Sequence, residues 1–173
     1  MNEKPEKPLH PAIRRGCLRR HIAAHGHGPE GTIEAAAYRS AATACVLATF
    51  GATPPTLSLT DDGAMFLPPT SQSAAEEIAV ALLAGGYAVR RYVPPEQRDL
   101  AEATARAAKI LKPYTGSLGE LQGIMRQLLL ASASIVYHDA QFWREVEALA
   151  TELLAQLRLS AEDIGRVIDG VRR

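Results

Sequence analysis

Apolar residues dominate one early stretch of the chain, residues 31–51, which is rich in alanine and has no Pro or Gly inside it. Alanine has the highest helix propensity of the amino acids, so this composition predicts an uninterrupted helix. Apolar positions such as Ile33, Ala37 and Leu47 leave little polar surface around the helix axis. The pattern therefore predicts a helix that is buried on most sides.

Further helices are predicted from apolar residues at helical spacing and from residues that favour helix starts. Ser73, Ser117 and Ser160 are each followed three positions later by an acidic residue, which is the pattern of a capping box. The apolar stripe over residues 142–157 is typical of core or helix–helix contact rather than of a cofactor-binding motif. The predicted helices span about residues 73–90, 97–111, 118–137, 142–157 and 160–168.

One short segment alternates with the two-residue period of a β-strand. Leu57 and Leu59 alternate with polar residues, Asp61-Asp62-Gly63 favours a turn, and Met65 and Leu67 repeat the period after it. We therefore predict a β-hairpin in an otherwise helical chain. The expected fold class is mainly α with one small β-hairpin.

Length and composition are those of one globular domain, with 173 residues of which 47% are hydrophobic and 22% charged. Aromatic residues make up only 5%, which favours close-packed helices over a β-sandwich. Residues 1–30 differ, because four prolines and the run Gly26-His27-Gly28-Pro29 interrupt any long helix. We predict a flexible basic tail over residues 1–30 and one domain over residues 31–170.

Charge is spread unevenly along the chain although the net charge is zero. Residues 1–28 contain six Lys or Arg and two Glu, a net charge of +4, which leaves −4 for the remainder. The two cysteines, Cys17 and Cys45, fall in the tail and in the predicted buried helix, so a disulfide framework is not indicated. No apolar signal-peptide core opens the chain, and no apolar run approaches the roughly 18 residues that span a bilayer. We expect a cytoplasmic protein with no membrane segment.

The tail contains two sets of candidate binding residues. Arg14-Arg15 and Arg19-Arg20 could contact phosphates, but no aromatic residues are interleaved to stack on bases, so we favour a solvated basic arm. His21 and His25 lie one helical turn apart and, with His27, could bind a metal ion. The neighbouring glycines oppose a stable helix, and no acidic residue is placed to orient the imidazoles. We favour adventitious metal binding, or none.

The segment Ala37-Tyr-Arg-Ser-Ala-Ala-Thr-Ala44 resembles the Ala-Tyr-His-Glu-Ala-Gly-His-Ala segment of the FtsH-type zinc peptidase domain. In this resemblance Arg39 and Thr43 stand at the two zinc-binding His positions, and Ser40 stands at the general-base Glu position. Catalytic zinc needs neutral imidazole ligands and a carboxylate base, whereas Arg is permanently cationic and Thr is a poor ligand. The resemblance is therefore to a peptidase segment without its catalytic groups.

The resemblance continues in order over about residues 32–168. Residues 77–87 resemble the family's Glu-Ile helix, and their Gly85-Gly86 pair suits close helix approach, with a helix end as the alternative. Residues 99–109 resemble its Asp-Leu…Ala-Thr helix, which implies that Asp99 stands at the position of the third zinc ligand. No Gly-x-x-x-x-Gly-Lys-Ser/Thr loop is present, so the likeness is to the peptidase half without the ATPase domain.

The resemblance implies a catalytically inactive pseudopeptidase that acts as a binding or regulatory module, with no metal and no cofactor. Met65, Phe66 and Leu67 on the second hairpin strand would offer an edge to an extended protein or peptide partner. The family's peptidase domain forms a ring, so a homo-oligomer or association with an active relative is also implied. Two alternatives stay open: a metallopeptidase-like enzyme with a nonstandard metal site from the tail histidines, and a regulator that binds nucleic acid through the basic tail.

If the fold is of this family, Arg39 and Asp99 approach each other where the metal would be. An unpaired cation beside an unpaired carboxylate would be costly in a partly buried pocket. We therefore predict a salt bridge between Arg39 and Asp99, with Thr43 or water taking a remaining hydrogen bond. The alternative is that Arg39 extends into solvent while Asp99 stabilises the start of its own helix.

Overall fold

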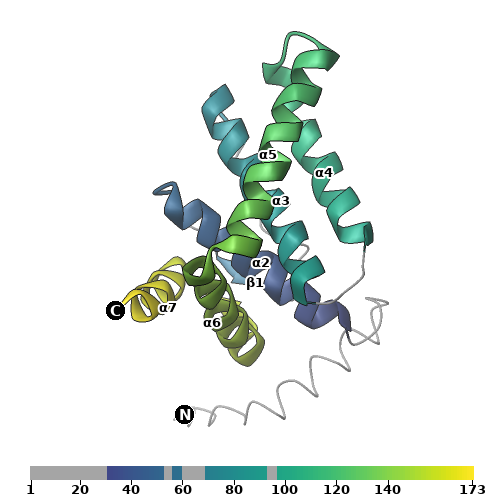
Figure 1. Ribbon diagram of the computed structural model, residues 1–173. Coiled ribbons are helices and arrows are strands. Elements are labelled where there is room, and N and C mark those ends of the chain that lie inside the picture. Colours follow the sequence, from purple (N-terminus) through teal and green to yellow (C-terminus); the bar gives the residue numbers. More distant parts are fainter. Residues whose placement is uncertain (1–30, 53–55, 60–68, 93–96) are drawn as a thin grey trace, which may run out of the picture.

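The computed structural model describes residues 31–52, 56–59, 69–92 and 97–173, without the side chains of residues 31–32 and 97–99. Within these ranges the chain forms six α-helices, one 3-10 turn and two short strands (Figure 1). The prediction of a mainly helical fold with one small sheet is confirmed for these residues. No helix within them combines the length and the apolar character that a membrane crossing needs. The elements are α2 (Gly31–Thr49), β1 (Leu57–Ser58), α3 (Gln72–Tyr92), α4 (Gln97–Leu111), η1 (Lys112–Tyr114), α5 (Leu118–His138), α6 (Ala140–Gln156), β2 (Arg158–Leu159) and α7 (Ala161–Arg172).

Helix α3 lies at the centre of the fold and packs against α2, α4 and α5 (Figure 1). Eleven of its 21 residues are buried, and seven of those eleven are Ala or Gly. Small side chains allow neighbouring helices to approach closely. On one side α3 shares a core with α2, α6, α7 and the strands, and on the other it shares a second core with α4 and α5. A helix covered on both sides explains why its apolar positions are not confined to one stripe.

The sheet joins two segments that are distant in the sequence. Strand β1 pairs antiparallel with β2, which places Leu57 opposite Leu159, and both side chains are buried. Leu157 ends α6 with a φ of 67°, and its carbonyl accepts a hydrogen bond from the Leu59 N–H at 2.9 Å. The sequence predicted β1 but not β2, because two residues are too few to show an alternating pattern. The second strand of the predicted hairpin, residues 65–67, lies outside the described residues, so the hairpin itself stays a prediction.

Helix starts follow the predicted serine caps in two cases out of three. Ser117 and Ser160 each accept a hydrogen bond from the backbone N–H three positions later, as predicted. The predicted cap at Ser73 is wrong, because α3 begins at Gln72 and Ser71 accepts the hydrogen bond from the Ala74 N–H at 3.2 Å. Two serines stand here with one residue between them, and the pattern alone does not determine at which of them the helix starts.

Candidate functional site

The positions that the resemblance assigns to catalysis lie on α2, and the structure packs Thr43 against α3. Thr43 is only 5% exposed. Its hydroxyl lies 2.9 Å from the Arg39 carbonyl in its own helix and 3.2 Å from the Ala81 carbonyl in α3, and its one hydrogen is shared between them. Arg39 and Ser40 are half-buried. Thr43 thus links two helices by a buried hydrogen bond.

Gly85 of α3 is the residue that permits this contact. A Cβ atom at position 85 would lie 2.8 Å from Thr43 Oγ1 and 3.0 Å from the Arg39 carbonyl oxygen, closer than side chains tolerate. The prediction that this glycine pair allows close helix approach is confirmed at Gly85. The alternative of a helix end is wrong, because α3 continues to Tyr92.

Several sequence-predicted site residues cannot be placed in this arrangement. The side chain of Asp99 lies outside the described residues, so the Arg39–Asp99 salt bridge stays a prediction. Within the described part of the chain, no three His, Cys, Asp or Glu side chains are grouped so as to hold a metal ion. The predicted partner-binding residues Met65, Phe66 and Leu67 also lie outside the described residues. The same holds for the candidate binding residues of the tail, which are His21, His25, His27, Arg14, Arg15, Arg19 and Arg20.

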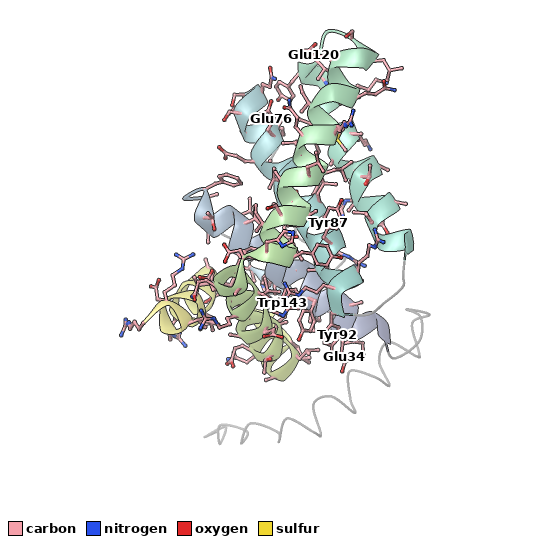
Figure 2. The ribbon with its side chains drawn as sticks, in the orientation of Figure 1. Glu34, Glu76, Tyr87, Tyr92, Glu120 and Trp143 are labelled. Atoms are coloured by element: carbon pink, nitrogen blue, oxygen red, sulfur yellow. The ribbon has the colours of Figure 1, made fainter. Side chains whose placement is uncertain are left out.

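A cluster of aromatic side chains lies where α2, α3 and α6 meet, and sequence reasoning did not find it (Figure 2). Tyr38 of α2 stacks on Tyr92 at the end of α3, with ring centroids 3.8 Å apart and planes inclined by 15°. Tyr38 also stacks with Trp143 of α6, at a centroid distance of 5.7 Å and an angle of 24°. Together with Arg91, these three residues form what we call the aromatic–arginine cluster.

Arg91 joins the cluster to one further helix, α5. The carbon of its guanidinium group lies 4.0 Å from the centroid of the Trp143 ring, which is a cation–π contact. The same group donates a hydrogen bond to the Val136 carbonyl in α5. A planar guanidinium can stack and donate at the same time, which an ammonium group cannot. Beside it, Tyr87 and Tyr137 meet edge to face at 6.0 Å, and they extend the aromatic surface from α3 onto α5.

The electrostatics of the cluster keep its phenols neutral. Burial raises the pKa of Tyr38 to about 12, with further contributions from Tyr92, Glu147 and Glu34. The Tyr92 hydroxyl donates to Glu34 Oε2 at 3.2 Å, and burial together with Glu34 raises the pKa of Tyr92. Both phenols are therefore protonated near neutral pH. The cluster and the neighbouring Glu34 present aromatic rings, hydroxyl groups, a guanidinium and a carboxylate, which are groups that can recognise a ligand.

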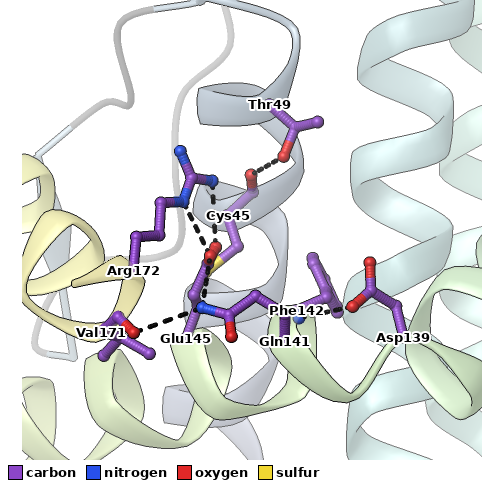
Figure 3. Close-up of polar contacts among 8 residues, drawn as sticks. All are labelled: Cys45, Thr49, Asp139, Gln141, Phe142, Glu145, Val171 and Arg172. Carbon is purple, nitrogen blue, oxygen red and sulfur yellow. Dashed lines mark hydrogen bonds and ion pairs between the residues drawn. The ribbon is translucent and has the colours of Figure 1, made fainter.

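A second polar centre holds α7 against α6 (Figure 3). Glu145 is 3% exposed and accepts two hydrogen bonds from Arg172, from Nε to Oε1 at 2.8 Å and from Nη2 to Oε2 at 3.2 Å. Gln141 donates to the same carboxylate at 3.5 Å and to the Val171 carbonyl at 3.4 Å. Burial, followed by the nearby Glu145 carboxylate, raises the pKa of the Cys45 thiol, so this thiol is protonated and unreactive. The expected burial of Cys45 is confirmed, and this centre is structural.

The only hint of the aromatic–arginine cluster in the sequence is that aromatic residues are few, so that each one present is a candidate for a specific role. Five of the nine aromatic side chains lie in the cluster or beside it, counting Tyr87 and Tyr137. They come from four helices, so no local spacing pattern connects them. We compared the chain with protein-family models, with curated proteins and with solved structures, and none of the three comparisons gives a match. The geometry of this chain is therefore the basis for the candidate site.

Proposed function

We propose that this chain is a non-catalytic protein-binding module built on a helical scaffold similar to the FtsH-type peptidase domain. The ordered sequence resemblance supports the scaffold, and the substitutions at Arg39, Ser40 and Thr43 support the loss of catalysis. The aromatic–arginine cluster supports the binding role. The proposal predicts neither peptide hydrolysis nor a dedicated zinc site in this domain.

The packing of Thr43 is the single observation that most supports a non-catalytic α2. A zinc-binding His at this position needs open space in front of the helix for its imidazole and for the metal. Here the Thr43 hydroxyl is already 3.2 Å from the Ala81 carbonyl. The helices are so close that a Cβ atom added at Gly85 would lie only 2.8 Å from Thr43 Oγ1. An imidazole is larger than the Thr side chain and would collide with the backbone of α3. This level of α2 is suited to helix packing.

The aromatic–arginine cluster supports a protein or peptide partner. Tyr, Trp and Arg are the residues most enriched at the energetic centres of protein interfaces. Tyr92 is 38% exposed and Tyr137 is 43% exposed, so part of this surface is open to a partner. The stacking and the hydrogen bonds hold the side chains in place beforehand, which reduces the entropy lost on binding. The strand edge at residues 65–67 is a second proposed contact, which the resemblance implies.

The absence of catalysis is tested with tag-free full-length protein and an unfolded, fluorescently labelled substrate such as casein. We expect no cleavage above background with added zinc, and the same result with a chelator, because the catalytic positions are substituted. A known zinc peptidase serves as the positive control. Chelator-sensitive cleavage that is lost in Asp99→Ala would overturn the proposal in favour of a metallopeptidase.

The binding role is tested by quantitative affinity capture with the wild-type chain, Tyr92→Ala and a matched control, Leu130→Ala. Leu130 is 67% exposed on α5, so it controls for loss of exposed apolar surface. We expect the wild type and Leu130→Ala to retain the same proteins, with retention reduced roughly tenfold or more for Tyr92→Ala, as for a residue central to an interface. Identical protein sets on all three chains would contradict the proposal. Sedimentation of the same three chains tests the implied homo-oligomer.

A further inference from the structure

Tyr92 is partly exposed at the edge of the aromatic–arginine cluster. Tyr38 stacks on its ring at a centroid distance of 3.8 Å, and 38% of Tyr92 is nevertheless exposed. The Tyr92 hydroxyl is held by Glu34, which lies in the first turn of α2. Figure 2 shows both side chains at the same end of the molecule. The result is an exposed aromatic ring with a carboxylate at its rim.

Glu147, which is exposed on α6, adds a second carboxylate. Glu147 stands four residues after Trp143 on α6, which places both on one face of that helix, and Trp143 stacks with Tyr38. Glu34 and Glu147 also both raise the pKa of Tyr38. Aromatic faces attract Arg and Lys cations, and a carboxylate beside the ring can pair with the same cation. The cluster already holds one guanidinium on a ring face, since the guanidinium carbon of Arg91 lies 4.0 Å from the centroid of the Trp143 ring. We call the surface formed by Tyr92, Glu34 and Glu147 the Tyr92 surface. Its ring and carboxylates are suited to a second guanidinium group.

The chain carries its own source of cations next to this surface. Residues 1–28 have a net charge of +4 and the remainder has −4. Helix α2 begins at Gly31 and Glu34 lies in its first turn, so a segment that precedes α2 starts beside the Tyr92 surface. Arg20 stands eleven positions before Gly31. Eleven residues of extended chain reach up to about 36 Å. A tethered segment of this length acts at an effective concentration of roughly millimolar order, so even a weak contact is populated.

We propose that the basic N-terminal segment binds the Tyr92 surface, with a guanidinium from Arg14-Arg15 or Arg19-Arg20 on the exposed part of the Tyr92 ring and paired with Glu34 or Glu147. This rests on the proposed function, because it gives the partner-binding surface a competitor within the same chain. A partner that brings its own cationic side chain displaces the segment. Salt weakens the contact, because pairs of exposed charges are screened.

Trp143 and Cys17 make the contact between the N-terminal segment and the Tyr92 surface measurable in the full-length chain. Trp143 is the only Trp and lies in the cluster, so its fluorescence reports from this site. Cys17 lies in the N-terminal segment, whereas Cys45, the only other cysteine, is fully buried, so a thiol-reactive dye labels Cys17. Energy transfer from Trp143 to this dye measures how close the segment lies to the cluster. A Cys17→Ser chain that takes up no dye verifies the labelling.

We expect the transfer efficiency to fall roughly two-fold or more when NaCl is raised to about 0.5 M. A similar fall is expected for the double variant Glu34→Gln/Glu147→Gln, in which a Gln at position 34 can still accept the Tyr92 hydrogen bond, so charge is removed with little change in shape. Glu102→Gln, an exposed carboxylate on α4, is the matched control and should leave transfer unchanged. Circular dichroism confirms that each chain is folded. The four arginines are tested together by changing Arg14, Arg15, Arg19 and Arg20 to Gln, with the same expected loss.

Equal transfer in the wild type and in Glu34→Gln/Glu147→Gln overturns the proposal. The proposal is also overturned if the transfer efficiency is unchanged by salt and by the Glu→Gln substitutions but falls when duplex DNA is added. That result would indicate that the segment binds nucleic acid. The result is separable from the proposed function. If Tyr92-dependent capture occurs without salt-sensitive transfer, only the docking of the segment is discarded. Chelator-sensitive cleavage discards the proposed function, and the transfer experiment still decides where the segment lies.

Discussion

Helices α2 and α3 meet in two different ways within two helical turns. At Gly85, small residues bring the helices so close that the Thr43 hydroxyl reaches the carbonyl of Ala81 on the other helix. At Tyr92, large rings fill the space between the helices and leave one ring partly exposed. The first contact excludes a ligand, whereas the second presents side chains to one.

The difference depends on side-chain size at equivalent positions. Gly85 and Tyr92 are seven residues apart on α3, which is close to two full turns, so they project from the same face. On α2, Tyr38 and Arg39 are consecutive and project about 100° apart, so one meets the aromatic rings and the other meets Gly85. Arg39 and Thr43 lie at the closed contact, whereas Tyr92 lies two turns away from Gly85 along α3.

The largest expected effect comes from opening the closed contact with Gly85→Ala. The added Cβ atom would meet the Arg39 carbonyl oxygen at 3.0 Å, and backbone of a packed helix yields little. We expect a loss of about 1–3 kcal/mol in the free energy of unfolding, as for overpacking of a core. Urea denaturation measures it.

The control for this substitution is Gly123→Ala in α5, where a Cβ atom meets nothing within 4 Å. Ala is the better helix former, so this change is expected to stabilise by up to about 1 kcal/mol. If Gly85→Ala is also neutral or stabilising, the two helices are not closely packed at this level.

On the open side, Arg91→Gln removes both the cation–π contact with Trp143 and a hydrogen bond to Val136. We expect a loss of about 1–2 kcal/mol, together with a change in Trp143 fluorescence, because the charge above the indole ring is gone. The neighbouring and exposed Arg90→Gln is the control and should stay within about 0.5 kcal/mol of the wild type. Equal thermal stability of the two variants would show that Arg91 does not hold the cluster.

A smaller effect is expected for the predicted salt bridge between Arg39 and Asp99. Arg39 is half-buried, so a double-mutant cycle with Arg39→Met and Asp99→Asn should give a coupling energy of about 1 kcal/mol. A fully buried pair would cost roughly 3–5 kcal/mol when one partner is removed. Zero coupling would favour the alternative, in which Arg39 extends into solvent.

Tyr38→Phe should change stability least near neutral pH, because the ring and its stacking remain. At alkaline pH the wild type differs, since the pKa of Tyr38 rises from 10.0 to about 12 in the folded chain. Between these values the unfolded state loses the phenolic proton while the folded state keeps it, so stability falls as pH rises. Urea midpoints measured over this range should fall less steeply for Tyr38→Phe. Parallel curves for the two chains would mean that Tyr38 is more exposed than its stacking implies.

Local signals in the sequence predicted the helices well. The helix expected over residues 97–111 has those bounds in the structure, and the caps at Ser117 and Ser160 are confirmed. These features depend on helix propensity and on hydrogen bonds to the next few residues, which short stretches of sequence encode. The failure at Ser73 has the same origin, because Ser71 offers the same local chemistry two residues earlier.

The candidate site was not open to the same reasoning. The motif positions Arg39, Ser40 and Thr43 were identified from the sequence, but the contact that fills the space around Thr43 is made by Gly85, on another helix. Tyr38, Tyr92 and Trp143 follow no local spacing pattern, since their meeting depends on which faces of three helices are in contact. Strand β2 was missed because two residues become a strand only when β1 lies beside them.

The sequence by itself therefore determined the helices, most of their starts, the buried character of α2 and the absence of a catalytic His-Glu-x-x-His set at residues 39–43. Only the tertiary structure decided that Gly85 closes one end of the α2–α3 contact and that Tyr38 and Tyr92 open the other. Helix formation depends on interactions over a few residues, whereas the relative rotation and approach of helices depend on the packing of side chains that are distant in the chain.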